Sequence, residues 1–496
     1  MADIFGIVKS KLTSTDARAL PSSPDVVREQ QRILHFKKLY DYYVFDRENI
    51  LNYVADMMKG TFKPKAIKKM QFPLYNITRK IIDQLAVAYL EPAERYTVAE
   101  KSAGEFVNSE EEAAYELYQE ILQGSNINSA SKSWNRLAKL LDTVYVGVMY
   151  RDGKIEYDLF PPHSLAVVES EENYLEPQEV RYERSIGDDF KEFVWTKDTY
   201  DVLDADGKRV EGFNQWNGVN KYGLIPLVPC RLRVPEDHWG EGDTELVNLN
   251  EKVNIINASS FFNAIMQSHG ILFATNLRLG EQLIAAAQKG SLENDGSEGE
   301  FQTGPDAVFE ANQVSKDDVQ PDLKFVNPDP SIDSNIKLID WMIKTLAVSK
   351  GLSASSVSTE ANESSGVAKQ VDLLELRERR RDDIEFLRPF EKRLFEVTRR
   401  VWNVNNPGNK LSEEAVFGID FVEPQPIMDE NQKLSVMEKK MGMGLASPVD
   451  MMKDEDEGID EEQALDYILR NLELNNKIMQ AKMAGTVIEE TMNGNV

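Results

Sequence analysis

Apolar residues recur at helical spacing in three long segments of the chain, residues 243–269, 332–350 and 364–403. Steps of three and four residues place such side chains on one side of an α-helix. We therefore predict a helix over each segment, and we expect Pro389 to kink the third. In the first segment the apolar stripe consists of Leu246, Leu249, Val253 and Ile256.

Shorter helical patterns lie on either side of these three segments. The pattern that includes Ile81 ends before Pro92, because proline disfavours helical backbone at the residue that precedes it. The chain returns as a predicted strand at 416–422 before its last helices. The shorter predicted helices cover residues 24–59, 77–88, 109–126, 129–143, 428–445, 447–454 and 460–484.

Alternating apolar and polar residues fill the segment 145–234, a pattern typical of β-strands. Asp152-Gly153 lies between two such runs and is a strong hairpin-turn signal, and Asp206-Gly207 is a second one. We therefore predict an antiparallel sheet or meander here. Helices and strands that are segregated along the chain in this way indicate the α+β class.

Residues 270–331 form a small insert between the first two long helices. Between residues 291 and 322 it has nine acidic residues and a single basic one, Lys316.

A segment of different composition follows the second long helix, where residues 351–363 are small, polar and rich in serine. We interpret residues 351–363 as a flexible loop between two helices.

The chain has 496 residues, of which 41% are hydrophobic, so it can bury large cores and has the length of roughly three domains. Cys230 is its single cysteine, which excludes an internal disulfide and, with four scattered histidines, a zinc site. No apolar run is long enough for a membrane span, and the first residues lack the core of a signal peptide. We expect a protein of the cytoplasm, or one assembled there.

Acidic residues outnumber basic ones by 84 to 57, which gives a net charge of −27. A protein that grips nucleic acid through its phosphates needs a basic surface, so this charge argues against that class. The charge is compatible with a protein that lets nucleic acid pass without gripping it.

Motifs of enzymatic chemistry are not found in the sequence. It contains no phosphate-binding P-loop, no dinucleotide fingerprint and no zinc-protease or serine-hydrolase motif. Asp204 and Asp206 resemble the opening of a calcium loop but lack its later ligands, so a hairpin turn is the favoured interpretation. We expect no catalytic residues, no metal site and no cofactor.

The order of these parts resembles the portal, or head–tail connector, proteins of tailed double-stranded-DNA bacteriophages of the long-tailed type. Local sequence adds to the resemblance. YNITRKIIDQLAVAYLEPAERY is similar to an N-terminal helix of the family, and YGLIPLVP followed by GEGDTE is similar to its entry into the stem. SSGVAKQVDLLELRERRRDDI is similar to the start of its long helix.

The resemblance implies a portal fold, with an α/β wing, a two-helix stem, a small α/β clip, a long kinked helix and an α-helical crown. The implied parts are the wing at 1–242, stem helices at 243–269 and 332–350, the clip at 270–331, the tunnel loop at 351–363, the long helix and return strand at 364–426, and the crown at 427–496.

For such a protein the resemblance implies a homo-oligomeric ring, a dodecamer in the family, at one vertex of a virion capsid. Genome DNA would pass through the ring during packaging and ejection without sequence-specific contacts. The implied partners are the large subunit of the terminase, which supplies the ATPase, and head-completion or adaptor, capsid and scaffolding proteins. We expect assembly in the host cytoplasm and no contact with a membrane.

The resemblance also assigns candidate site residues in three groups. The tunnel loop would face DNA through Lys350, Ser353, Ser355, Ser356, Ser358, Thr359, Glu360, Asn362 and Glu363. The stem would contact neighbouring subunits through Leu246, Leu249, Val253 and Ile256. The clip would offer an acidic docking face with Glu293, Asp295, Glu298 and Glu300.

Two alternatives remain open at this point. The chain could be an α/β enzyme with an unrecognised site, for example a metal site at Asp204 and Asp206. It could also be another virion subunit, such as a capsid or adaptor protein. The sequence does not determine the host, the copy number, the tail type or the residues that touch DNA.

Overall fold

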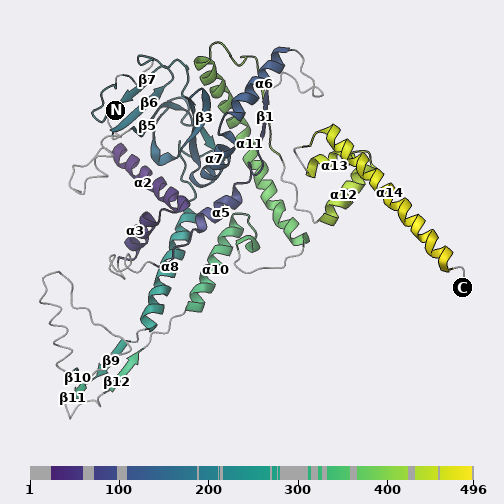
Figure 1. The fold of residues 1–496 in the computed structure, drawn as a ribbon. Coiled ribbons are helices and arrows are strands. Elements are labelled where there is room, and N and C mark those ends of the chain that lie inside the picture. Colours follow the sequence, from purple (N-terminus) through teal and green to yellow (C-terminus); the bar gives the residue numbers. More distant parts are fainter. Residues whose placement is uncertain are drawn as a thin grey trace. The chain divides into compact units, whose positions relative to one another are not determined.

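The computed structural model falls into two compact units, residues 1–422 and 423–496. The first unit combines helices with several small antiparallel sheets, which confirms the predicted α+β class (Figure 1). The structure describes residues 24–59, 72–97, 109–186, 189–210, 212, 216–268, 271–275, 277–279, 311–313, 322–326, 332–357, 366–422, 430–455 and 459–493.

The helix predicted over 24–59 is wrong as a single element. It divides at Phe45, whose φ of 65° is left-handed, and Asp46 then caps a new helix by accepting a hydrogen bond from the Asn49 N–H. The other N-terminal helices lie close to their predicted bounds. The helices are α2 (Pro24–Val44), α3 (Arg47–Met57), α5 (Ile77–Leu85), α6 (Ser109–Gln123) and α7 (Ile127–Leu141).

The strands form two sheets where a single antiparallel sheet or meander was predicted. A three-stranded sheet has the order β3-β2-β8, and a four-stranded meander has the order β4-β5-β6-β7. The hairpin at Asp152-Gly153 is confirmed, with φ angles of 48° and 81° at its two turn residues. The strands are β2 (Thr143–Arg151), β3 (Lys154–Phe160), β4 (Leu165–Glu169), β5 (Pro177–Ile186), β6 (Asp189–Thr196), β7 (Tyr200–Leu203) and β8 (Leu227–Arg231), and the short helix η1 (Pro162–Ser164) precedes β4.

An aromatic cluster forms the centre of the first unit. Trp134 of α7 is fully buried, and its ring lies 5.7 Å from Tyr89, 5.5 Å from Phe390 and 6.4 Å from Tyr157, centroid to centroid. These residues come from two helices, a strand and, for Tyr89, the turn after α5. Edge-to-face contacts of this kind add to the stabilisation from burial.

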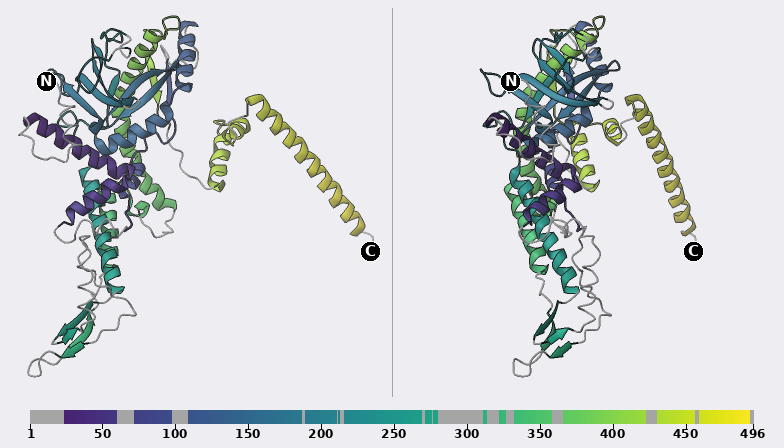
Figure 2. Two further views of the ribbon diagram at one scale, coloured as in Figure 1. Left: turned by 60° about the vertical axis from the view of Figure 1, so that its left-hand side comes forward. Right: turned by 90° about the vertical axis from the view of Figure 1, so that its left-hand side faces the viewer.

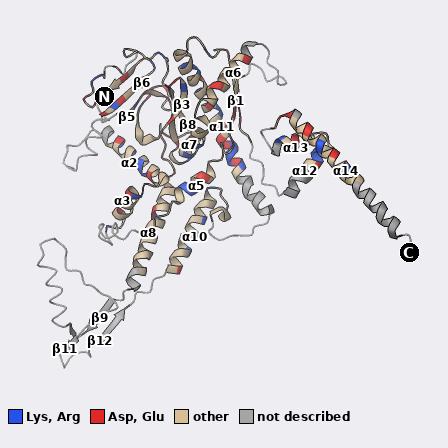
Figure 3. Ribbon diagram, in the orientation of Figure 1, with Lys and Arg blue, Asp and Glu red and all other residues tan. Residues whose placement is uncertain are grey.

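The long helix α11 (Gly366–Asn405) contains Pro389 and remains helical on both sides of it. Figure 3 shows acidic and basic residues mixed along its middle. These charges are not all solvated, because Arg380 donates to the carbonyls of Val87 and Val422 and Asp383 pairs with Lys139 at 2.6 Å. One side of the helix is therefore packed within the first unit, and the other side is exposed.

The predicted return strand is confirmed as β13 (Phe417–Asp420), which pairs antiparallel with β1 (Glu94–Thr97). At this point Arg95 of β1 binds Glu391 of α11, with 2.6 Å between Nη2 and Oε1 and 3.0 Å between Nε and Oε2. The Tyr89 hydroxyl donates to the same carboxylate at 2.6 Å. Both charged side chains are 1% exposed, so this is a buried ion pair that joins the strand pair to the long helix.

The insert after the first long helix contains two short antiparallel ladders. Strand β9 (Ile271–Thr275) pairs with β12 (Asp322–Val326), and β10 (Leu277–Leu279) pairs with β11 (Ala311–Gln313). The second unit consists of α12 (Glu430–Gly442), α13 (Pro448–Glu455) and α14 (Glu461–Asn493), which confirms three predicted C-terminal helices.

Candidate functional site: the helical pair and its base

Helices α8 (Thr244–Ser268) and α10 (Ile332–Ser349) run side by side in opposite directions, and we call them the helical pair (Figures 1 and 2). Hydrogen bonds fix both ends of the contact. The Asn335 side chain donates to the Ser260 hydroxyl at 2.8 Å, and Lys350 lies 2.8 Å from the Asp243 carboxylate. Both helices were predicted from their apolar spacing, and both are confirmed.

The base of the pair is an ion pair between the start of α8 and the end of α10. Asp243 accepts a hydrogen bond from the Leu246 N–H at 3.1 Å, so it also caps α8. Lys350 is 17% exposed and has the Asp243 charge beside it. Sequence reasoning predicted Lys350 as an attractive contact for DNA, but in the structure its charge is already compensated within the chain.

Helix α10 ends in a Schellman motif centred on Gly351. The Gly351 N–H donates to the Val348 carbonyl and the Leu352 N–H to the Ala347 carbonyl, each at 2.9 Å. Gly351 has a φ of +71°, and a Cβ there would lie 2.3 Å from Arg379 Nε. Glycine is therefore favoured at this position by its left-handed backbone conformation, and the Arg379 side chain of α11 lies close against it.

The first part of the predicted tunnel loop is folded. Residues Ala354–Val357 form the 3₁₀ turn η2, in which Ser353 and Ser355 share a hydrogen bond of 2.8 Å. The Ser356 carbonyl accepts a hydrogen bond from the Gln84 side chain of α5 at 3.0 Å. The remaining candidates lie outside the described residues, namely Ser358, Thr359, Glu360, Asn362 and Glu363.

The predicted apolar stripe of α8 has two buried residues and two half-buried ones. Leu246 and Val253 are 0% and 1% exposed and pack within the same chain. Leu249 and Ile256 are half-buried and keep exposed area. Of these four residues, only Leu249 and Ile256 keep surface that is open to contact.

Helix α10 has an exposed apolar face that sequence reasoning missed. Trp341 is 62% exposed, and Leu338 and Val348 lie on the same side of the helix at 42% and 57%. Trp341 and Leu249 lie on either side of a groove of about 570 Å³ between the two helices. The other residues of the groove are Glu245, Asn248, Lys252, Met342, Thr345, Leu346 and Ser349.

A row of asparagines on α8 holds the start of α5. The Asn250 Oδ1 atom accepts hydrogen bonds from the N–H groups of Ile77 and Thr78 at 2.8 and 2.9 Å, and its Nδ2 donates to the Tyr75 carbonyl at 2.8 Å. Asn254 accepts from the Tyr75 N–H at 2.9 Å. These side chains satisfy N–H groups that the first turn of a helix leaves unpaired. The helical pair is thereby tied to the α/β body, by which we mean the helices and sheets of residues 24–242.

We expect Asn250→Ala to lower the free energy of unfolding by about 3 kcal/mol, because it leaves buried backbone groups of α5 without partners. Asn263→Ala, at an exposed position of the same helix away from the groove, is the control and should change stability by less than about 0.5 kcal/mol. Urea denaturation followed by circular dichroism measures both values. Equal midpoints for the two variants would contradict the role given to Asn250.

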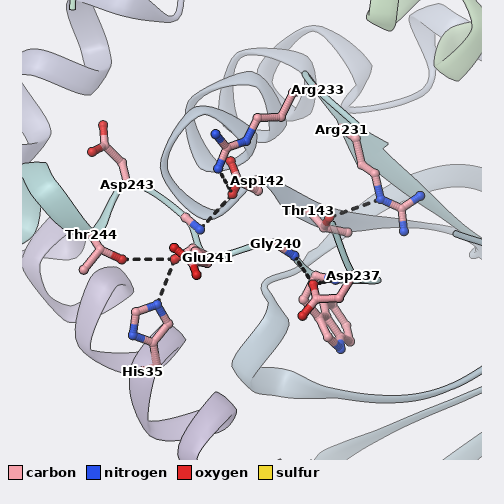
Figure 4. Close-up of polar contacts among 12 residues, drawn as sticks. His35, Asp142, Thr143, Arg231, Arg233, Asp237, Gly240, Glu241, Asp243 and Thr244 are labelled. Carbon is pink, nitrogen blue, oxygen red and sulfur yellow. Dashed lines mark hydrogen bonds and ion pairs between the residues drawn. The ribbon is translucent and has the colours of Figure 1, made fainter. Parts of the chain in front are cut away.

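The turn before α8 is anchored at several points (Figure 4). Asp142, at the end of α7, accepts a hydrogen bond from the Gly242 N–H at 2.8 Å and pairs with Arg233. A Cβ at Gly240 would lie 2.7 Å from the Asp142 carboxylate, and one at Gly242 would lie 2.6 Å from Leu39. The glycines of the GEGD sequence therefore allow α8 to start close against the body.

His238 lies within this anchored turn and is fully buried. Its Nε2 atom is 2.7 Å from the Tyr145 hydroxyl and its Nδ1 atom 2.7 Å from the Tyr174 carbonyl. Burial lowers the pKa of His238 to about 4. His238 is therefore a structural residue of this turn, held by Tyr145 and by the Tyr174 carbonyl.

Acidification should therefore destabilise the protein between pH 6.5 and 4. In this window the unfolded chain binds a proton at His238 and the folded chain does not. The free energy of unfolding therefore decreases as pH falls, by up to about 3 kcal/mol for this residue. His238→Gln removes this titration. Its urea midpoint should depend less on pH than that of the wild type, and identical pH profiles would refute the assignment.

The metal alternative finds no geometric support at its named residues. The Asp204 Oδ1 atom accepts hydrogen bonds from the N–H groups of Asp206 and Lys208 at 2.9 and 2.8 Å, as expected of a turn. Among the residues that the structure describes, no three His, Cys, Asp or Glu side chains form a group that could hold a metal ion. In the same part of the chain, no helix is long and apolar enough to cross a membrane.

The four acidic residues assigned to a docking face, Glu293, Asp295, Glu298 and Glu300, lie outside the described residues.

No protein-family model and no curated protein sequence matches the chain. The chain is similar to a chain in the "Virion of native gene transfer agent (GTA) particle", at 11% identity and a TM-score of 0.33, over 74% of this chain and 82% of that one. It is also similar to a chain in the "Neck of empty GTA particle computed with C6 symmetry", at 11% identity and a TM-score of 0.35, over 76% of this chain and 87% of that one.

Proposed function

We propose that the chain is the subunit of a portal-type ring at a capsid vertex, through which double-stranded DNA enters and leaves a virion. The subunits would form a closed homo-oligomer, and the ring would dock the terminase during packaging and head-completion or tail proteins afterwards. In this proposal the protein is structural and the ATPase belongs to its partner.

The observation that carries the proposal is the arrangement around the helical pair. Two antiparallel helices leave the α/β body, hold the β9–β12 and β10–β11 ladders between them, and return to a short loop before a helix of 40 residues. This order of elements is the one that the resemblance to portal proteins implies. The likeness to the gene transfer agent chains adds no weight to this argument.

For the contact between subunits we propose the exposed face of the helical pair. It includes Leu249 and Ile256 from the predicted stripe, and it adds Trp341 with Leu338 and Val348. An exposed tryptophan beside an apolar groove is typical of the residues that dominate interfaces. Leu246 and Val253 would support this face from beneath rather than touch a neighbour.

The charge of the chain fits a channel that does not grip DNA. At −27 per subunit, a ring would repel phosphates over most of its surface. The serines at 353–358 offer few strong phosphate contacts, and Lys350 already pairs with Asp243. DNA would therefore remain centred and able to slide, with the tunnel loop as its nearest neighbour.

Topological retention on DNA tests the proposed function. Assembled protein is mixed with linear duplex DNA, both DNA ends are then blocked with streptavidin, and the salt concentration is raised to screen phosphate contacts. We expect retention at high salt on end-blocked DNA alone. DNA with free ends should be released, and circular DNA of equal length should never be retained. Equal binding to circles, or loss from blocked DNA, would contradict threading.

A further inference from the structure

Helix α14 of the second unit has an unusual amount of exposed apolar surface. Its side chains are described up to Gln480, and Ala464 near its start is buried. Seven large apolar residues are each about half exposed or more: Leu465 49%, Tyr467 54%, Leu469 52%, Leu472 54%, Leu474 47%, Ile478 53% and Met479 61%. A helix of a soluble protein normally buries such residues against a partner.

These residues form two stripes rather than one. Leu465, Leu469, Leu472 and Met479 follow one another at steps of four, three and seven residues, and Tyr467, Leu474 and Ile478 follow at steps of seven and four. Because a helix turns by about 100° per residue, the two stripes lie on nearly opposite sides. Asn476 is a polar position within the first stripe.

The two edges between the stripes are polar in different ways. Asp466, Arg470, Glu473 and Lys477 share one edge at steps of four, three and four, and Asn471 and Asn475 lie on the other edge. The charged edge has two acids, each four residues before a base, which is the favourable order for ion pairs along a helix. Residues 463–480 therefore have no net charge in a chain whose net charge is −27.

Two opposite apolar stripes require two neighbours. A helix with one apolar stripe can bury it in a dimer, but a second stripe on the far side would stay exposed. If the first stripe of each helix packs against the second stripe of the next, the contact is heterologous and repeats until it closes. The neutral charge of this segment allows identical helices to lie side by side while the rest of the acidic chain repels its copies.

We propose that α14 packs between the α14 helices of two neighbouring copies, so that these helices form a closed ring of side-by-side helices, here called the palisade, with the charged edge along one surface. This inference rests on the proposed ring and extends it by naming the contact made in the second unit. The occupant of each apolar stripe is the opposite stripe of another copy of this chain.

Cysteine cross-linking in the full-length assembled protein tests the palisade. The native Cys230 is buried, so a short bis-maleimide reagent should react at introduced cysteines. Leu472→Cys and Leu474→Cys place one thiol on each stripe at nearly the same height. We expect each variant alone to remain uncross-linked, their co-assembled mixture to give covalent dimers, and the double variant to give a ladder that ends at the copy number of the ring.

A matched pair on the polar edges, Glu473→Cys and Asn475→Cys, is the control, and its mixture should give no dimers. Dimers from either single-stripe variant alone would overturn the heterologous contact. If electron microscopy of the same samples shows rings but the stripe variants do not cross-link, the palisade is wrong and the ring stands. If neither rings nor cross-links form, both the ring and the palisade are contradicted.

Discussion

Glu391→Gln should lower the free energy of unfolding by about 3–5 kcal/mol, the largest single-residue effect that we expect in this protein. The substitution keeps the shape of the side chain but removes its charge. Arg95 is 1% exposed and would lose its ionic partner while remaining buried. Burial lowers the pKa of the Arg95 guanidinium, but the Glu391 charge more than offsets this and raises it overall, so Arg95 stays charged.

Glu396→Gln is the matched control, because Glu396 lies on an exposed position of the same helix. It should leave stability within about 0.5 kcal/mol of the wild type. Replacing both partners, as Arg95→Met with Glu391→Met, should recover most of the loss, since no charge is then buried alone. Chemical denaturation of the wild type, the two single variants and the double variant measures these free energies. A loss below 1 kcal/mol for Glu391→Gln would show that Arg95 finds another partner.

Trp341→Ala should weaken assembly while leaving the fold intact. A buried tryptophan anchor commonly contributes about 2 kcal/mol to an interface, which corresponds to roughly a 30-fold weaker contact when it is lost. Because Trp341 is 62% exposed in the single chain, its removal should change the stability of the isolated subunit little. Mass photometry over a dilution series should show rings dissociating at higher protein concentration than in the wild type.

Asp333→Ala provides the comparison for this prediction, since Asp333 is exposed on the same helix outside the apolar face. Its dilution profile should match that of the wild type. If Trp341→Ala dissociates at the wild-type concentration, the exposed face of the helical pair is not the subunit contact. If it unfolds at lower urea concentration instead, Trp341 belongs to the core of the chain.

Much of the fold follows from apolar periodicity alone. The helices α8, α10 and α11 lie within about two residues of their predicted bounds, because long amphipathic patterns have few alternative structures. Which strands pair with one another was harder to predict. Alternation identifies strands but not their partners, so the predicted single sheet or meander is in fact two sheets, β3-β2-β8 and β4-β5-β6-β7.

Features that depend on contacts between distant residues were not predicted. No glycine or proline marks the break at Phe45, where the backbone is left-handed and Asp46 caps the next helix. Lys350 looks like a free cation in the sequence, because its partner Asp243 lies 107 residues away. Asn250 and Asn254 did leave a signal, since these amides are four residues apart on the side of the helix that carries the apolar residues Leu246 and Val253.

End-on electron microscopy of the purified full-length protein tests the central claim most directly. The account predicts closed rings with a central opening wide enough for duplex DNA, and their symmetry would give the copy number. Monomers at every protein and salt concentration would contradict it, and a closed ring without a through-channel would favour a different virion subunit.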